Sequence, residues 1–180
     1  MAENLNEVLI GSRGWLHPGW EGGFYPDDLP PDWRLAYYAN EFPMVVIREQ
    51  EWAQIADIQA LREDCPDTFR FVVELNREDM RAQLEHIGQL GEQCAGVIVA
   101  AEQGKAFEAC RPRLPEKIPC YRENETDSLI TVSSGTSLKQ LRAYLETALQ
   151  PAAMPSLLIV DGKPPDIELL RQAGTLLTLL

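Results

Sequence analysis

Short hydrophobic runs recur along the chain, and each has the composition of a buried β-strand. They contain few polar positions, which is typical of strands covered on both faces of a parallel sheet. Eight such runs cover residues 8–11, 44–48, 69–75, 96–101, 118–122, 129–133, 157–161 and 175–180. The last run consists of four leucines and two threonines, so we expect it to be buried and to close the sheet beside the first strand.

The segments between most of these runs place apolar residues at helical spacing. In residues 32–42, 78–90 and 137–149 the hydrophobic side chains fall on one stripe of a helix. A further helix is expected over residues 166–172, after two prolines and before Gly174. Strands and helices thus alternate. This order predicts a mainly parallel sheet with helices outside it, either open and doubly wound or closed as a barrel.

One pair of expected strands does not fit this order. Only residues 123–128 separate the runs at 118–122 and 129–133, whereas adjacent parallel strands need a connection of about a dozen residues or more. Either the two form an antiparallel hairpin, or one of them is not a strand of the barrel. The chain has 180 residues, and a standard barrel of eight units needs about 250. We therefore predict one domain over residues 1–180, folded as an abbreviated or irregular α/β barrel.

Charge and cysteine spacing narrow the function classes. The chain carries 16 Lys and Arg against 28 Asp and Glu, a formal charge of −12 at pH 7. This charge disfavours a nucleic-acid partner, because such binding depends on basic residues that neutralise phosphates. No apolar run approaches the ~20 residues that cross a bilayer. We therefore expect no contact with a membrane. No C-x-x-C spacing occurs among the four cysteines, Cys65, Cys94, Cys110 and Cys120, so we expect reduced thiols and a cytoplasmic location.

Motifs for cofactors and metals are absent from the sequence. The stretch GSRG at residues 11–14 lacks the third glycine of a dinucleotide fingerprint, and the chain has no Walker lysine pattern. His17 has no Cys, Asp or His nearby at the spacing of a metal site. We therefore predict no cofactor and no bound zinc or iron.

Several motifs in the first half carry a family resemblance. The chain reads IGSRGW at residues 10–15, HPGW at 17–20, FYPDDLP at 24–30, LAYYANEF at 35–42 and DTFRF at 67–71. Together these resemble the YecE-like family, domain of unknown function 72, whose members read I-G-T-S-G-W, F-Y-P-x-x-L-P and D-F-R-F. The resemblance covers about residues 8–75. It implies a TIM-barrel-like α/β fold with mainly parallel strands and outer helices, and it implies little about activity.

The chain departs from the family pattern at charged positions. Where the family reads V-E-I-N, this chain has Val46 at the acidic position and Arg48 at the asparagine. Where the family has F-x-V-K-x-P-R, Glu74 replaces the lysine and Asn76 the proline. The chain is also shorter than usual members and does not align after Arg77. These departures leave open whether any ancestral activity is retained.

The candidate site follows from the fold class. Ligands of parallel α/β folds bind at the C-terminal ends of the strands. The charged and aromatic residues after the first three expected strands are Arg13, Trp15, His17, Trp20, Tyr25, Arg48, Glu49, Glu74 and Arg77. The two leading arginines could bind a phosphate or carboxylate through paired donors, or could form local ion pairs with Glu49 or Glu74. The aromatic residues could line a pocket or seal the end of the barrel.

Two functional hypotheses remain. In the first, a small anionic ligand binds at the C-terminal mouth around Arg13, Arg48 and Glu74. Enzymatic activity stays open in this case, because Glu49, Glu51 and Glu74 could supply a pair of carboxylates for acid–base chemistry. In the alternative, the chain is a catalytically inactive family member that acts through protein–protein contacts, which include a homo-oligomer formed through an exposed sheet edge. A cavity beside the arginines would favour the first hypothesis.

Overall fold

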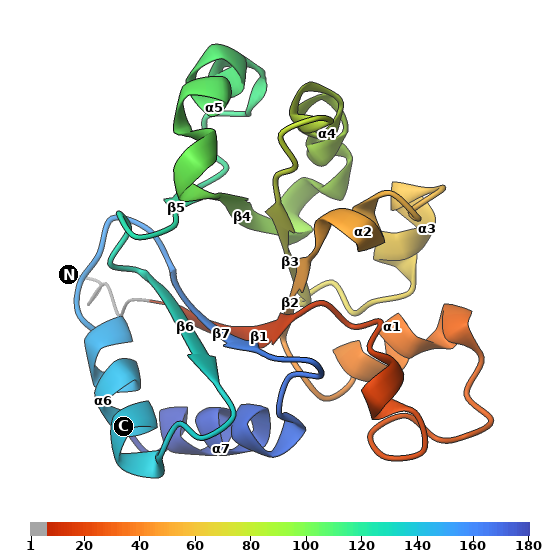
Figure 1. Cartoon of the computed structure of the whole chain (residues 1–180), viewed down its shortest axis with the longest axis vertical. Coiled ribbons are helices and arrows are strands. Elements are labelled where there is room, and N and C mark those ends of the chain that lie inside the picture. Colours follow the sequence, from red (N-terminus) through yellow and green to blue (C-terminus); the bar gives the residue numbers. More distant parts are fainter. Residues whose placement is uncertain (1–6) are drawn as a thin grey trace.

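The computed structural model describes residues 7–180, and its seven strands form one curved, all-parallel sheet (Figure 1). The strands are β1 (Val8–Arg13), β2 (Met44–Ile47), β3 (Arg70–Glu74), β4 (Cys94–Val99), β5 (Cys120–Arg122), β6 (Leu129–Ser133) and β7 (Ser156–Asp161). Their order is β5-β4-β3-β2-β1-β7-β6. The sheet curls into an incomplete barrel, the TIM-barrel-like α/β fold that the sequence predicts.

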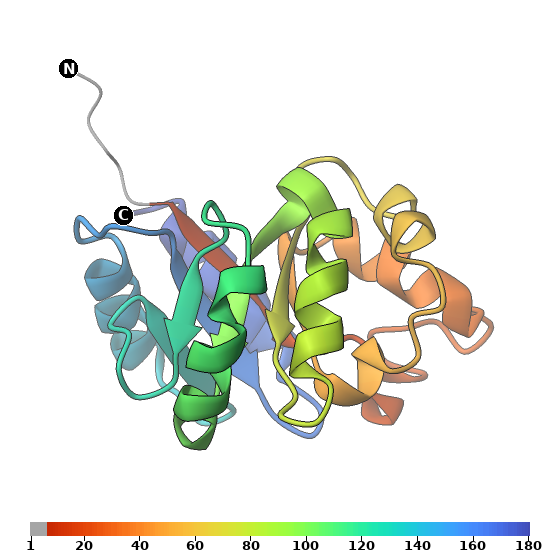
Figure 2. The same ribbon diagram turned by 90° about the horizontal axis from the view of Figure 1, so that it is seen from above.

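Helices surround the outside of the curled sheet (Figures 1 and 2). They are α1 (Arg34–Ala39), α2 (Glu49–Trp52), α3 (Ile58–Glu63), α4 (Met80–Ile87), α5 (Gly104–Cys110), α6 (Leu138–Ala148) and α7 (Ile167–Leu177). Short 3-10 helices cover Pro18–Trp20, Pro31–Trp33, Gly88–Gln93, Ala101–Gln103 and Arg111–Arg113. Over residues 7–180, no helix has both the length and the apolar character needed to cross a membrane.

Side chains alternate along each strand between the inside of the barrel and the helical layer. The inner cluster consists of Leu9, Met44, Val46, Val72, Ile98, Tyr121, Leu157 and Ile159. The intervening residues, such as Ile10, Val45 and Val73, pack outward in the larger cluster with the helices. Because both faces are buried, the strands show nearly continuous hydrophobicity in the sequence.

The two edge strands resolve the conflict over the short connection, and both expected alternatives are wrong. β5 pairs parallel to β4, and β6 pairs parallel to β7, so neither a hairpin nor a strand outside the barrel is found. β5 and β6 lie at opposite edges of the sheet and are not hydrogen-bonded neighbours. Residues 123–128 therefore need no crossover helix. β5 is also only three residues long, so the chain has only a short distance to return along the strand direction before β6 begins.

The expected final strand over residues 175–180 is also wrong. Helix α7 continues past Gly174, where the sequence predicts its end, and runs to Leu177. Leu179 and Leu180 are 75% and 46% exposed, and β7 takes the place beside β1. The run lacks β-branched side chains apart from threonine, and leucine is a strong helix former, so the helical stripe simply continues. One exposed glycine costs a helix only about 1 kcal/mol.

The four cysteines are free thiols. Burial raises the pKa of Cys65 to about 12 and that of Cys94 to about 11. Burial also raises the pKa of Cys120, although Arg122 and Arg111 partly oppose this effect. These three thiols therefore stay protonated at neutral pH and are weak nucleophiles.

A side chain from β5 reaches across the barrel to the chain just before β7. The Tyr121 hydroxyl donates a hydrogen bond of 2.8 Å to the carbonyl oxygen of Pro155, which directly precedes β7. Tyr121 is fully buried, so its ring also fills the inner cluster. This contact links β5 to the N-terminal end of β7.

Replacing Tyr121 by phenylalanine tests this bridge. Tyr121→Phe removes one hydrogen bond and keeps the ring, so we expect the free energy of unfolding to fall by about 1 kcal/mol in urea denaturation. Tyr144→Phe is the matched control, because Tyr144 is 40% exposed on α6. It should change stability by less than about 0.5 kcal/mol. Equal stability of the two variants would contradict a structural role for the hydroxyl.

Candidate functional site

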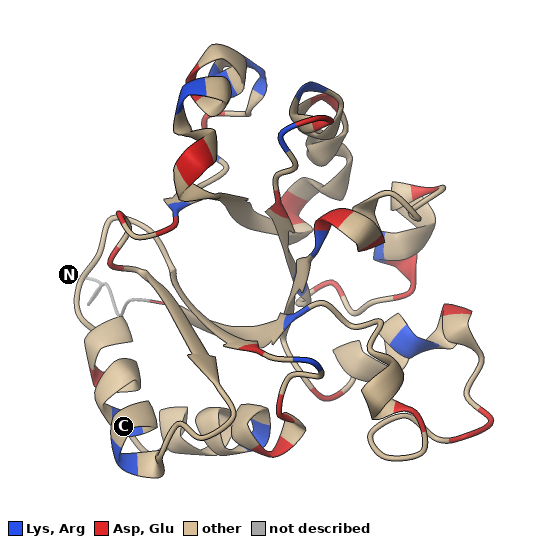
Figure 3. Cartoon of the chain, in the orientation of Figure 1, with Lys and Arg blue, Asp and Glu red and all other residues tan. Residues whose placement is uncertain are grey.

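The C-terminal ends of the parallel strands bring charged residues to one mouth of the barrel (Figure 3). Arg13 ends β1, Arg48 directly follows β2, and Glu74 ends β3. This convergence is as the sequence predicts. Glu123 and Asp161, which follow or end β5 and β7, join the same group through contacts with Arg13.

Arg13 is held by three carboxylates. Its Nη1 lies 3.2 Å from Glu74, its Nη2 3.4 Å from Glu123 and its Nε 3.4 Å from Asp161. The side chain is 16% exposed. Arg13 thus forms an ion pair with Glu74, which the sequence allowed as the alternative to binding a ligand. Two further carboxylates contact the other nitrogens of the same guanidinium. An anion at Arg13 would have to approach three negative charges.

The pKa of Glu74 reflects this crowding. Burial raises the pKa of Glu74 above its usual value, and the nearby Glu123 and Asp161 raise it further. The positive charges of Arg13 and Arg48 oppose the shift without cancelling it. The carboxylate is therefore less easily ionised in the folded chain than in water.

A cleft of about 670 Å³ opens beside Arg13. We call it the acidic cleft; its lining is Arg13, Glu123, Asn124, Glu125, Thr126, Asp127, Leu129, Thr131 and Asp161. The cavity that the first hypothesis requires therefore exists beside Arg13. However, four carboxylates and a single guanidinium line it. Its electrostatic character favours a cationic occupant over an anionic one.

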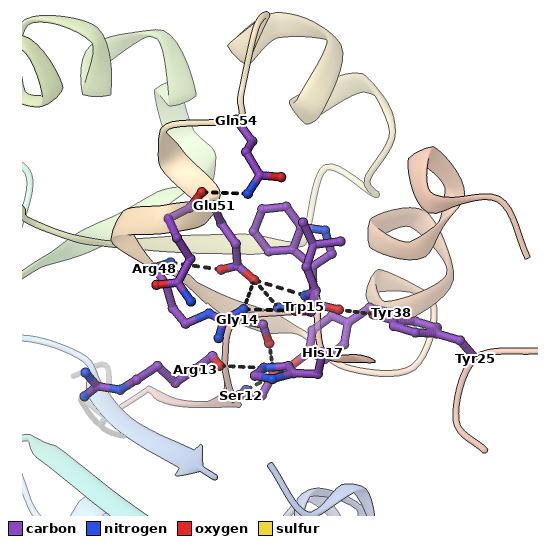
Figure 4. A network of polar contacts seen from close by, with 12 residues as sticks. Ser12, Arg13, Gly14, Trp15, His17, Tyr25, Tyr38, Arg48, Glu51 and Gln54 are labelled. Atoms are coloured by element: carbon purple, nitrogen blue, oxygen red, sulfur yellow. Dashed lines mark hydrogen bonds and ion pairs between the residues drawn. The ribbon is translucent and has the colours of Figure 1, made fainter. Parts of the chain in front are cut away.

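A buried carboxylate, Glu51, organises the neighbouring loop (Figure 4). Glu51 is 1% exposed, and its oxygens accept hydrogen bonds from the backbone N–H groups of Trp15 (2.9 Å) and Leu16 (3.0 Å). They also accept from the backbone N–H of Arg48 at 3.0 Å and from its guanidinium at 2.8 Å. Arg48 therefore pairs with Glu51, and the expected pairing with Glu49 is not formed. One carboxylate ties the loop after β1 to the end of β2.

Gly14 is required at the centre of this arrangement. Its φ of +83° lies in the left-handed region, which residues with a Cβ rarely adopt. A Cβ here would also lie 2.2 Å from Nε of Arg48 and 2.7 Å from an oxygen of Glu51. Because both the backbone angle and the space exclude a side chain, only glycine allows the loop to reach Glu51.

A second buried contact fixes the end of β1 to helix α1. The Tyr38 hydroxyl accepts a hydrogen bond of 2.9 Å from the backbone N–H of Ser12 and donates one of 3.0 Å to the carbonyl oxygen of Met44. The Ser12 hydroxyl lies 2.6 Å from the carbonyl oxygen of Gly14. Burial raises the pKa of Tyr38, so the phenol stays protonated and can donate. The backbone around Arg13 is thus held from both sides.

The expected aromatic residues lie in the core. Trp15, Trp20 and Tyr25 are 5%, 3% and 0% exposed. The Tyr25 hydroxyl donates to the carbonyl oxygen of Trp15 at 2.7 Å, and the Trp20 indole donates to that of Pro165 at 2.9 Å. These contacts favour the sealing role over a pocket wall.

The remaining candidate residues divide between the inside and the surface. His17 is buried, and its Nε2 lies 2.9 Å from the carbonyl oxygen of Arg13. Burial lowers the pKa of His17 and the positive charge of Arg48 lowers it further, so the ring is neutral at neutral pH. Glu49 is exposed and accepts a hydrogen bond of 2.6 Å from Asn76. Arg77 is exposed and lies outside these networks.

A second hollow of about 450 Å³ lies between the segments that follow β1, β2 and β7. We call it the Arg48 hollow; its lining is Leu16, His17, Pro18, Gly19, Arg48, Gln50, Glu51, Gln54, Lys163 and Pro164. The sequence reasoning missed Lys163, which follows Asp161 by two positions. The rule of strand ends points to Asp161 at the seventh strand, and Lys163 lies in the loop that follows it. Nothing in the sequence pattern indicates the structural role of Glu51.

The family comparison settles what kind of chain this is. The model of the family described as "Protein of unknown function DUF72" matches residues 9–124. The chain belongs to the DUF72 family. This is the YecE-like family of the resemblance, and the match extends beyond residues 8–75 to just after β5.

Two crystal structures of a DUF72 family protein from Enterococcus faecalis V583 resemble this DUF72 chain. One has a TM-score of 0.61 at 12% identity and covers 96% of each chain. The other has a TM-score of 0.60 at 11% identity and covers 97% of each chain. At such identities the likeness shows the fold alone. No curated protein matches the chain.

Metal-ligating groups do not gather in the described part of this DUF72 chain. Across residues 7–180, no three His, Cys, Asp or Glu side chains are arranged to hold a metal ion. Within the Arg48 hollow, Glu51 already accepts four hydrogen bonds. Its oxygens are thus occupied by the protein itself.

Neutralising Glu51 should destabilise the fold strongly. Glu51→Gln removes the charge that compensates Arg48 and points an amide N–H at backbone donors. We expect the free energy of unfolding to fall by about 3 kcal/mol in urea denaturation. Glu49→Gln, two residues earlier on the same helix, is the control and should change it by less than about 0.5 kcal/mol. Comparable losses in both variants would show that Glu51 does not organise the loop.

Glu74 gives a prediction with a definite pH dependence. Because folding raises its pKa, the folded state holds more protons than the unfolded state as the pH rises above the ordinary value of 4.5. The contribution of Glu74 to stability therefore falls through this range. Glu74→Gln removes that loss while Arg13 keeps Glu123 and Asp161, so the stability of the variant relative to the parent should rise from pH 4 to pH 7.

Chemical denaturation at both pH values measures this difference. Glu78→Gln, which changes an exposed carboxylate in the following loop, should show no such trend. A relative stability of Glu74→Gln that falls between pH 4 and pH 7 would refute the raised pKa.

Proposed function

We propose that this DUF72 protein binds a small anionic ligand in the Arg48 hollow at the C-terminal mouth of the strands. The charge of the lining carries the proposal. Two cationic side chains, Arg48 and Lys163, line this hollow together with one carboxylate, Glu51. The acidic cleft beside Arg13 has the opposite balance, so the anion site predicted from sequence is better matched by Arg48 than by Arg13.

Arg48 retains donor capacity for a ligand. Its Nη2 donates to the carbonyl oxygen of Leu16 at 3.1 Å and to Glu51 at 2.8 Å. Nη1 donates to no residue in the range 7–180, and the side chain is 18% exposed. A guanidinium held in place by two partners loses little freedom when a further acceptor binds.

Lys163 supplies the excess positive charge. It is exposed and forms no ion pair within residues 7–180. Glu51 is compensated by Arg48 and three backbone N–H groups, so the lysine charge is left over. The neutral His17 adds no charge to the wall. A phosphate or carboxylate group of a small molecule would meet both cations in this hollow.

The engagement of the carboxylates supports binding rather than acid–base catalysis. Glu51 is occupied by structural hydrogen bonds, Glu74 by Arg13, and Glu49 by Asn76. A general acid or base must instead reach the proton it transfers. We further propose that the protein acts in the cytoplasm, where its free thiols would stay reduced, and without a nucleic-acid partner, given its formal charge of −12.

Calorimetric titration with inorganic phosphate and with citrate tests this function. Saturable binding of at least one of them is expected. Lys163→Gln should weaken it about threefold to tenfold, because one charged partner is lost. Lys139→Gln, an exposed lysine on α6 away from the hollow, should leave the affinity unchanged. Binding of neither probe, or equal loss in both variants, would refute an anion site in this hollow.

A further inference from the structure

The outer edge of β6 presents unpaired backbone groups at its centre. The N–H of Leu157 on β7 donates to the carbonyl oxygen of Ser128 at 2.7 Å. The alternation of a parallel ladder then directs Ile130 and Val132 toward β7 and turns the backbone of Leu129, Thr131 and Ser133 to the open side. At the two ends of this edge, the N–H of Leu129 donates to the carbonyl oxygen of Thr126 at 3.1 Å, and the carbonyl oxygen of Ser133 accepts from the N–H of Thr136 at 3.0 Å. The centre of the edge, at Thr131, stays open. No backbone group in residues 7–180 bonds to the N–H or C=O of Thr131 on that side.

The facing edge of β5 is different because its own turn covers it. The backbone N–H of Arg122 donates to the Thr126 hydroxyl at 2.8 Å, and its carbonyl oxygen accepts from the N–H of Thr126 at 3.0 Å and of Glu125 at 3.2 Å. The Tyr121 hydroxyl of β5 also reaches across the barrel to Pro155, at the N-terminal end of β7. The opening between the two edge strands is therefore available only along β6.

The acidic cleft occupies this opening. Leu129 and Thr131 of β6 line it together with residues 123–127, Arg13 and Asp161. An unpaired parallel edge beside a cavity of about 670 Å³ can accept an additional strand. Because the side chains of a strand alternate in direction, every second residue of such a strand would face the carboxylates of the cleft.

We propose that an extended, basic segment of a partner protein adds to β6 as a further strand and places alternate Lys or Arg side chains in the acidic cleft. Glu123 and Asp161 share the guanidinium of Arg13, and the further carboxylates of Glu125 and Asp127 leave the cleft with an excess of negative charge that provides the charge complementarity. The residues between the basic positions would lie against the outer side near Ile130, which is half-buried, so apolar side chains suit them. About five residues match the length of β6.

Charge also argues against a second copy of the chain as the occupant. Two chains with a formal charge of −12 each would repel one another. In addition, pairing β6 of one copy with β5 of another would place the acidic cleft of the first against the acidic turn at residues 123–127 of the second. The homo-oligomer through a sheet edge that the sequence allows is thus an alternative outcome of the test.

Fluorescence anisotropy with a labelled peptide tests the proposal without altering the protein. The probe is the peptide Lys-Val-Lys-Val-Lys-Val-Lys, and saturable binding is expected. A version N-methylated at every peptide bond keeps every charge but loses its backbone donors in either strand direction, so its affinity should be at least about tenfold weaker. The corresponding glutamate peptide should not bind. Absence of binding, or equal affinity of the methylated peptide, would overturn strand addition.

Two variants locate the binding edge. Thr131→Pro removes an N–H that points away from β7, so the affinity for the peptide should fall about tenfold. The fold should be kept, because proline is tolerated on edge strands. Asp127→Asn should weaken it less and make it less sensitive to salt. Lys163→Gln, in the Arg48 hollow, should have no effect. Unchanged peptide affinity in Thr131→Pro, or a dimer of the parent in sedimentation analysis that this variant dissociates, would refute the proposal, the latter in favour of a second copy.

Discussion

The arrangement of the mouth depends on the burial of one charged group, the carboxylate of Glu51. A carboxylate removed from water is stable only if charges and hydrogen bonds replace its hydration. Three backbone N–H groups and the Arg48 guanidinium do so here, and they come from two separate segments of the chain. The requirement to satisfy Glu51 therefore fixes the loop after β1 against the end of β2. Gly14 gives that loop the space it needs.

Most of the fold could be predicted from local sequence patterns. All seven strands lie within or close to expected hydrophobic runs, because strands buried on both faces are recognisable by composition alone. The prediction of an eighth strand was wrong because a leucine-rich segment can form the apolar stripe of a helix as well as a buried strand. The predicted arrangement of β5 and β6 was wrong for another reason. The order of strands in a sheet depends on long-range pairing, and the length of the connection between two strands does not reveal it.

The site was predictable only in outline. Parallel strands bring their C-terminal ends together, so the convergence of Arg13, Arg48 and Glu74 follows from strand positions. Which carboxylate pairs with which arginine does not, since it depends on side-chain direction and on the path of each loop. Arg13 faces the inside of the barrel and meets Glu74, Glu123 and Asp161, whereas Arg48 meets Glu51. The two arginines therefore differ in the charge of their surroundings.

The gap between β5 and β6 also determines how the chain can be divided. Residues 123–128 are the covalent link across the gap, and no ladder joins the strands they connect. A backbone break in this segment would leave every pairing of the sheet intact. The two fragments would carry β1 to β5 and β6 to β7, and the ladder between β1 and β7 would be their main seam. The molecule thus contains a natural split point for reassembly from two separately produced pieces.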